Sequence, residues 1–283
     1  MNERIENALK VFRYKRTNIK AVSWGLAILL LVGGIFLLNA LSELERFKVL
    51  QNPYVTFGLY LVLLVGAAAL FTYYNDFKLR KALAELDFIV DELKDPQTYL
   101  SILDGFGRFD KRMVTPAYLH AKLRAMMYAS SDREIQEFVN KFEDVMGDSL
   151  NIESALFRIK SYGEKRQNVD SFEAIITKKL DKAYAKAKTN AIRASIDHQR
   201  KWLDVQTMVV RLKFNEVLKV LELLQEDECT PLESVRINYY KGLAYARLGH
   251  NKQAREAFTQ VIHEGNTTRF VHDAKGEYEK VRN

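Results

Sequence analysis

The sequence predicts an all-α protein in which a two-helix transmembrane hairpin precedes a soluble domain of stacked antiparallel helix pairs. Three observations carry this prediction. Two long runs near the N-terminus contain no charged residue. The rest of the chain places apolar residues three and four positions apart, which is the spacing of one helix face. No segment alternates apolar and polar residues in the manner of a half-buried strand.

The two charge-free runs extend from Ala21 to Leu41 and from Tyr54 to Tyr74. A helix rises about 1.5 Å per residue, so each run matches the roughly 30 Å of a hydrocarbon core. A cleaved signal peptide is the alternative for the first run, but the run exceeds the roughly 7–15 apolar residues of such peptides. Residues 21–74 are therefore predicted to cross the lipid bilayer twice, with residues 42–53 as the external loop.

Basic residues predict the orientation of this hairpin. Residues 1–20 hold six Lys or Arg, whereas the loop holds two and residues 75–81 hold three. Such residues collect on the cytoplasmic side, so residues 1–20 form a basic cytoplasmic flank and both termini lie inside. The single cysteine, Cys229, excludes an intrachain disulfide and suits a reducing compartment. We therefore expect an integral protein of a bacterial cytoplasmic membrane.

Residues 75–96 are predicted to continue the second span as a juxtamembrane helix. One apolar stripe recurs at spacings of four and three, formed by Leu79, Leu83, Leu86, Val90 and Leu93. The stripe can pack on the following domain or pair with a second chain, and Pro96 ends the run.

Residues 97–283 are predicted to form a cytoplasmic helical domain. Gly105 and Gly107 lack the further glycine and preceding strand of a nucleotide-binding loop, so they indicate a loop between helices. Pro116 suits a first helical turn, and Ser131 suits a helix N-terminus. Helices are also expected over residues 152–162 and through most of 164–230, where neither Gly nor Pro occurs.

A spaced set of small and aromatic residues lies near the C-terminus. It consists of Gly242, Tyr245, Gly249, Ala254 and Phe258, at spacings of 3, 4, 5 and 4. Gly242 and Ala254 fit a close approach of two helices, and Gly249 fits a turn that needs a positive φ. The pattern resembles a tetratricopeptide repeat over residues 236–265, and more loosely over about 197–265.

The resemblance has one departure and several implications. Asn238 stands where the family carries an aromatic residue. Because one repeat cannot bury its apolar face alone, the resemblance implies a short solenoid of stacked helix pairs. It further implies that a concave face binds a protein or peptide partner, and it implies no reaction.

Candidate chemistry is sparse. The five histidines form no close metal-ligand pair, and phosphate-binding, hydrolase and kinase motifs do not occur. We therefore predict no enzyme activity, no cofactor and no metal. The positive charge clusters instead in residues 178–201, which include Lys178, Lys179, Lys182 and Lys186. A solvated helix face, contact with anionic lipid headgroups and contact with an acidic partner are the interpretations, and nucleic acid is the least favoured.

The leading functional hypothesis is a membrane-anchored adaptor or scaffold that binds a protein or peptide partner at the cytoplasmic face. The first alternative is a structural subunit of a larger transport or envelope assembly. The second alternative is an enzyme whose site the sequence does not reveal.

Overall fold

A computed structural model describes residues 3–43, 52–109, 115–146, 169–227 and 229–282. All secondary structure in these residues is helical, which confirms the predicted all-α class. The chain divides into two compact units, Met1–Leu86 and Asp87–Asn283.

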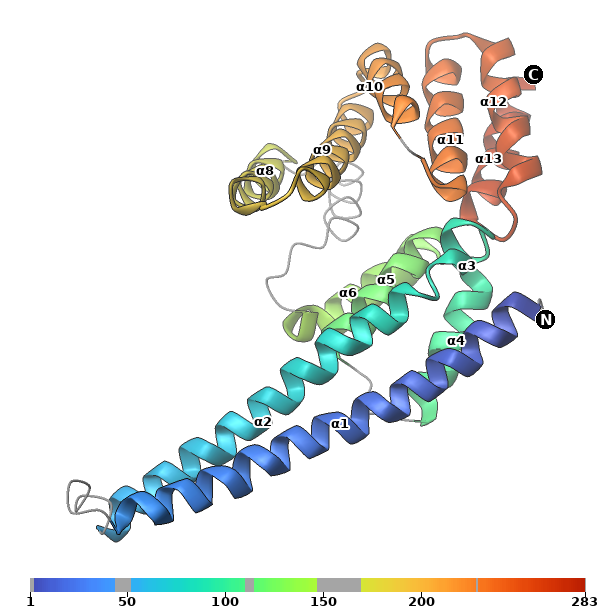
Figure 1. Cartoon of the computed structure of the whole chain (residues 1–283). Coiled ribbons are helices and arrows are strands. Elements are labelled where there is room, and N and C mark those ends of the chain that lie inside the picture. The colour runs from blue at the N-terminus through green and yellow to red at the C-terminus, as the bar shows by residue number, and fades with distance from the viewer. Residues whose placement is uncertain (1–2, 44–51, 110–114, 147–168, 228, 283) are drawn as a thin grey trace. The chain divides into compact units, whose positions relative to one another are not determined.

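The first unit is an antiparallel pair of long helices, α1 (Glu3–Ser42) and α2 (Pro53–Ala84), which lie side by side (Figure 1). At one end, Lys15 of α1 pairs with Glu85, just beyond α2, with 2.5 Å from Nζ to Oε1. At the other end, the Tyr60 hydroxyl donates to Asn39 Oδ1 at 2.9 Å. Because α1 begins at Glu3, the basic flank is part of the same helix as the first apolar run.

Small residues allow α1 and α2 to approach closely. Ser23, Ala27 and Ala67 are buried. A Cβ on Gly34 would lie only 2.7 Å from Cδ2 of Leu63, so a larger residue at this position would require the Leu63 side chain to move. Small residues at a helix contact are common where lipid tails provide no hydrophobic driving force.

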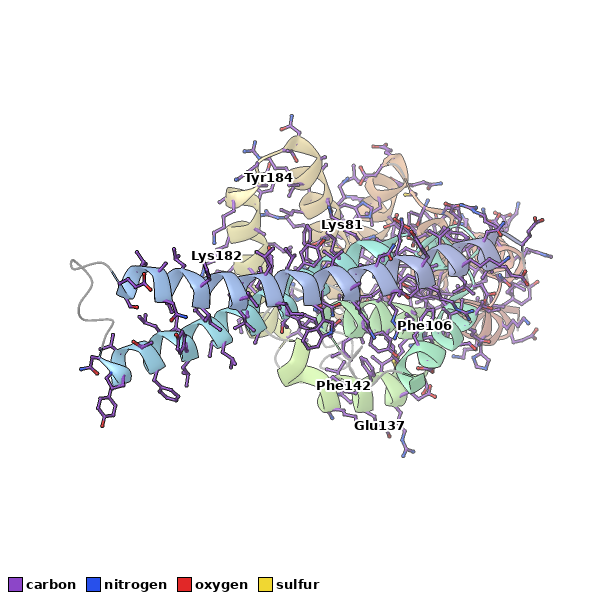
Figure 2. All side chains as sticks on the ribbon, turned by 60° about the horizontal axis from the view of Figure 1, so that its bottom comes forward. Lys81, Phe106, Glu137, Phe142, Lys182 and Tyr184 are labelled. Carbon is purple, nitrogen blue, oxygen red and sulfur yellow. The ribbon has the colours of Figure 1, made fainter. Side chains whose placement is uncertain are left out.

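The apolar faces of this helix pair are largely uncovered. Of the most apolar 18-residue stretch, only 11% is buried in α1 and 6% in the helix that begins at Pro53. Leu29, Phe36 and Phe57 are 71%, 75% and 69% exposed. Figure 2 shows side chains projecting outward around both helices. By length and composition both helices are able to cross a membrane, and they are not the buried core helices of a globular protein.

The second unit contains the remaining helices. They are α3 (Phe88–Asp91), α4 (Pro96–Phe109), α5 (Pro116–Ala129), α6 (Asp132–Met146), α8 (Val169–Lys186), α9 (Asn190–Val210), α10 (Phe214–Glu226), α11 (Pro231–Arg247), α12 (Asn251–Glu264) and α13 (Arg269–Arg282). Helices that follow one another along the chain pack together from α3 to α6 and from α8 to α13.

Local sequence explains where several of these helices begin. The Thr115 side chain accepts from the Tyr118 amide, and Pro116 occupies the first turn of α5. Thr230 and Glu233 form a reciprocal capping box at α11. Ser131 precedes α6, and the Glu134 carboxylate accepts from its amide at 2.8 Å. The expected starts at Pro116 and after Ser131 are confirmed.

The structure corrects two expectations about residues 75–109. The single helix expected over 75–96 is divided, since α2 ends at Ala84 and α3 begins at Phe88. The Leu86 amide bonds the Leu83 carbonyl at 2.9 Å, a tighter pattern than an α-helix uses. The loop expected at Gly105 and Gly107 is wrong, because α4 runs through both residues. The helix expected over 152–162 lies outside the described residues.

The C-terminal helices also contact the beginning of the second unit. The side-chain Nδ2 of Asn266 donates to the Leu93 carbonyl at 2.9 Å, and the Thr267 hydroxyl donates to Asp95 Oδ1 at 2.6 Å. Arg269 reaches Asp132 Oδ1 at 2.7 Å. In an open solenoid each repeat contacts only its neighbours in the sequence. The contacts made here by Asn266, Thr267 and Arg269 instead join residues more than a hundred positions apart.

Candidate functional site

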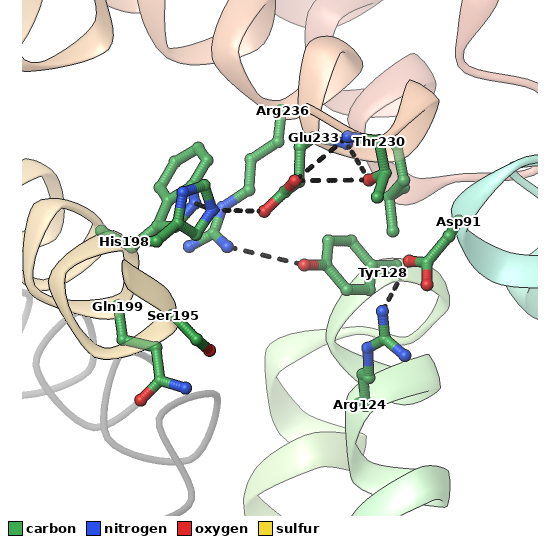
Figure 3. Close-up of a pocket in the computed structure, with 11 residues that line it drawn as sticks. Asp91, Arg124, Tyr128, Ser195, His198, Gln199, Thr230, Glu233 and Arg236 are labelled. Carbon is green, nitrogen blue, oxygen red and sulfur yellow. Dashed lines mark hydrogen bonds and ion pairs between the residues drawn. The ribbon is translucent and has the colours of Figure 1, made fainter. Parts of the chain in front are cut away.

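A cavity of about 290 Å³ lies in the second unit (Figure 3). Four helices contribute to its lining: α3 provides Asp91, α5 provides Arg124 and Tyr128, α9 provides His198 and Trp202, and α11 provides Arg236. The lining therefore combines charged groups of both signs with two aromatic rings.

His198 lies between two carboxylates. Its Nε2 is 2.7 Å from Glu233 Oε1, and its Nδ1 is 3.1 Å from Asp227 Oδ2. The hydrogen bond to Glu233 raises the pKa of His198, burial opposes this rise, and Asp227 adds to it. Lys201 Nζ completes the group at 2.9 Å from Asp227 Oδ2. Each ring nitrogen faces a carboxylate oxygen, which favours the doubly protonated imidazolium, and the Trp202 Nε1–H lies 3.2 Å from Nε2 on another side.

Glu233 connects this histidine to the start of α11. Its Oε1 faces His198, and its Oε2 accepts from the Thr230 amide at 3.2 Å. Burial alone would raise the pKa of Glu233, but the hydrogen bonds from His198 and Thr230 outweigh burial and lower it. One carboxylate therefore both caps a helix and lines the cavity.

Arg236 presents a stacked guanidinium to the cavity. Its Cζ lies 3.6 Å from the centroid of the Trp202 ring, and its Nη1 is 3.5 Å from the Tyr128 hydroxyl. Among the described residues it makes no ion pair within 4.0 Å. Stacking fixes a guanidinium plane while leaving its N–H edge available to an acceptor. Arg236 is consequently the cationic group of the cavity best placed to receive a ligand.

Arg124, by contrast, is already occupied. Its Nη1 is 3.0 Å from Asp87 Oδ2, and its Nη2 is 2.5 Å from Asp91 Oδ1. Burial alone would lower the pKa of Arg124, but the two carboxylates hold it above its ordinary value. This triad joins α5 to α3 and closes one side of the cavity.

The five residues of the repeat-like pattern lie in α11, α12 and the turn between them. A Cβ on Gly242 would meet Cε1 of Phe258 at 2.5 Å. Ala254 and Phe258 are fully buried, Gly249 has a φ of 78°, and the Tyr245 ring makes an edge contact with His250. These residues hold the helix pair together, and none of them lines the cavity.

The four lysines of the basic cluster lie on α8, away from the cavity lining. Lys178, Lys182 and Lys186 are exposed and four residues apart, so they share one face, while Lys179 is half-buried. Figure 2 labels Lys182 on this helix. Within the described part of the chain these four side chains have no ion-pair partner.

Sequence reasoning did not identify the cavity. Glu233 and Asp227 lie 35 and 29 positions from His198, and no short motif links residues that far apart. The available signal was the pair Thr230 and Glu233, which has capping-box spacing but points only to a helix start. In the described residues, no group of three or more His, Cys, Asp or Glu side chains is arranged to hold a metal ion.

The fold and cavity define an all-helical protein with two long, exposed apolar helices and a polar cavity among its remaining helices. Comparisons with protein-family models, curated proteins and solved structures find no match to this chain.

Proposed function

We propose that the protein is a membrane-anchored adaptor whose helical domain binds a protein or peptide segment at the cytoplasmic face. The observation that carries the anchoring is the exposure of apolar side chains along α1 and α2. Leaving so much apolar surface in water costs about 25 cal/mol for each Å², whereas a bilayer covers it without cost.

The cavity supports the binding half of this proposal. A peptide carries amide groups as well as charged and apolar side chains, and the lining offers partners for each of these. Gln199 and Ser195 provide hydrogen-bonding groups, Trp202 provides an apolar surface, and Arg236 provides a cation held in one plane. The repeat-like pair α11 and α12 supports the same class, because such pairs serve as binding scaffolds.

Alkaline extraction tests the anchoring. Membranes that contain the full-length protein are washed with sodium carbonate and centrifuged. The protein should stay in the pellet and dissolve only when detergent is added. Release by carbonate alone would show that it is not embedded, and the anchoring would have to be abandoned.

Photo-crosslinking tests the binding. A benzophenone amino acid at Gln199, in the cavity lining, should give a discrete adduct in native membranes. The same group at Gln253, which is exposed on α12, serves as the control and should not. Adding R236Q should reduce the Gln199 adduct because the stacked cation is lost. Identical adducts from both positions, or no effect of R236Q, would contradict the cavity as the binding site.

The lysine face of α8 is a second contact surface under the same proposal. Lys178, Lys179, Lys182 and Lys186 suit anionic headgroups or an acidic partner, at about 1 kcal/mol for each basic residue near an anionic bilayer. Charge reversal of the three exposed lysines should weaken cosedimentation of the protein with anionic vesicles or with its acidic partner. Unchanged cosedimentation would show that these lysines form only a solvated helix face.

A further inference from the structure

A groove of about 290 Å³ lies between α1 and α2 near the ends that carry Lys15 and Glu85. Its charged lining consists of Lys15, Lys78, Lys81 and Glu85. Three positive charges therefore oppose one negative charge. A volume at the lower end of the range for ligand sites suits a small anionic group rather than a whole macromolecule.

The polarity of the groove changes in the same direction along both helices. On α1 the lining passes from Lys15 through Asn18 to Ile19 and Val22. On α2 it passes from Lys81 and Lys78 to Tyr74. Both sequences lead from charged residues into the two charge-free runs. The groove is thus charged at one end and apolar at the other, which is the polarity of a phospholipid from phosphate to acyl chain.

Two of the three lysines are available to a ligand. Lys15 is engaged by Glu85, with Nζ 2.5 and 2.6 Å from the two carboxylate oxygens. Lys78 Nζ lies 5.5 Å from the Tyr74 ring centroid, and Lys81 Nζ lies 4.8 Å from that of Phe77. Within the described residues neither ammonium group has a carboxylate partner. A ring face orients an ammonium group but leaves its N–H donors free for an oxyanion.

We infer that this groove binds the headgroup phosphate of an anionic phospholipid, with Lys78 and Lys81 as the phosphate ligands. Tyr74, Ile19 and Val22 contact the glycerol and the first part of an acyl chain. The inference rests on the proposed anchoring in a bilayer, since it places the groove where the charged and apolar zones of a membrane meet. Two residues that each contribute about 1 kcal/mol correspond to roughly 30-fold in affinity.

Native mass spectrometry of the full-length protein in neutral detergent tests the inference. The protein is titrated with phosphatidylglycerol and, separately, with phosphatidylcholine. The wild type should prefer phosphatidylglycerol, and K78Q/K81Q should weaken this binding by about 30-fold. R13Q/R80Q is the matched control, because it removes two charges from the same helices outside the groove lining. It should change the affinity by less than about 3-fold.

A variant that is expected to bind phosphatidylglycerol more tightly provides a second test, in case K78Q/K81Q folds poorly. E85Q releases Lys15 and removes the one negative charge of the lining, so it should tighten phosphatidylglycerol binding several-fold. Equal losses in K78Q/K81Q and R13Q/R80Q would indicate general surface attraction and overturn the site. Displacement by glycerol phosphate or inorganic phosphate at the lipid's own concentration would indicate a free-anion site and overturn the lipid assignment.

Failure of the proposed lipid site and failure of the proposed membrane anchoring give different experimental results. A protein that stays in carbonate-washed membranes but shows no preference for phosphatidylglycerol keeps its anchor and loses only the groove. A protein released by carbonate loses the anchor itself.

Discussion

Gly242 of α11 lies directly against the ring of Phe258 of α12, and a methyl group on Gly242 would come within 2.5 Å of that ring. Phe258 has no exposed surface, and its ring lies 6.3 Å from that of Tyr239. The ring is therefore confined by its own neighbours as well as by the glycine.

G242A should destabilise the helical domain, because overpacking a filled core costs about 1–3 kcal/mol. For a domain of this size we expect the apparent melting temperature of the full-length protein to fall by about 3–9 °C. G276A is the matched control, since Gly276 is an exposed residue of α13 with open space around its Cβ position. It should raise stability slightly because Ala favours helix. Equal shifts for both variants would contradict the packing of Gly242 on Phe258.

The stability of the domain should depend on the protonation of His198. The pKa of His198 is raised in the folded protein, chiefly by Glu233, so the folded state holds this proton more tightly than the unfolded state. The resulting stabilisation is complete below the unfolded pKa of about 6.5 and is lost as the pH rises through the folded pKa. The contribution of His198 should therefore lower the melting temperature as the pH rises above about 6.5.

H198Q should flatten this pH profile, while H272Q should leave it intact because the His272 side chain is 96% exposed. Melting temperatures at a series of pH values provide the measurement. The contribution of Glu233 is separable, since the lowered pKa of its carboxyl places the loss of its stabilisation at acid pH. A slope in H198Q as steep as in the wild type would assign the pH dependence to another group.

R269A should loosen the contact between α13 and the start of α6. Arg269 Nη1 is 2.7 Å from Asp132 Oδ1 and 3.1 Å from the Ser130 carbonyl, and its side chain is 18% exposed. Removing a partly buried partner of a charged hydrogen bond costs about 1–3 kcal/mol. The melting temperature should drop by several degrees, about 3–9 °C. K275A, at an exposed position of the same helix, should be nearly neutral, and a comparable drop there would point to a general loss of charge.

The predicted orientation is testable with single cysteines. In a C229A background, E43C lies in the predicted external loop of residues 42–53, and K10C lies in the basic flank. A membrane-impermeant maleimide should label E43C in intact spheroplasts, and K10C only after the membrane is opened, because basic flanks stay inside. The reverse labelling pattern would invert the topology.

Much of the fold was predictable because its causes are local. Charge-free runs, capping residues such as Thr115 and Ser131, and apolar residues three and four apart act within one or two turns of helix. Gly249 was also readable, since a turn with positive φ favours glycine wherever it occurs. The loop predicted at Gly105 was wrong, because α4 continues through this residue. A glycine costs a helix only about 1 kcal/mol, which tertiary packing can outweigh.

The sequence by itself thus determined the helical class, the two apolar helices and the small residues that α11 and α12 require. Only the tertiary structure decided that His198 meets Glu233 and Asp227, that Arg236 stacks on Trp202, and that Arg269 reaches Asp132. These contacts join residues 29 to 137 positions apart. Their partners are chosen by the packing of whole helices, and no local propensity or spacing encodes that choice.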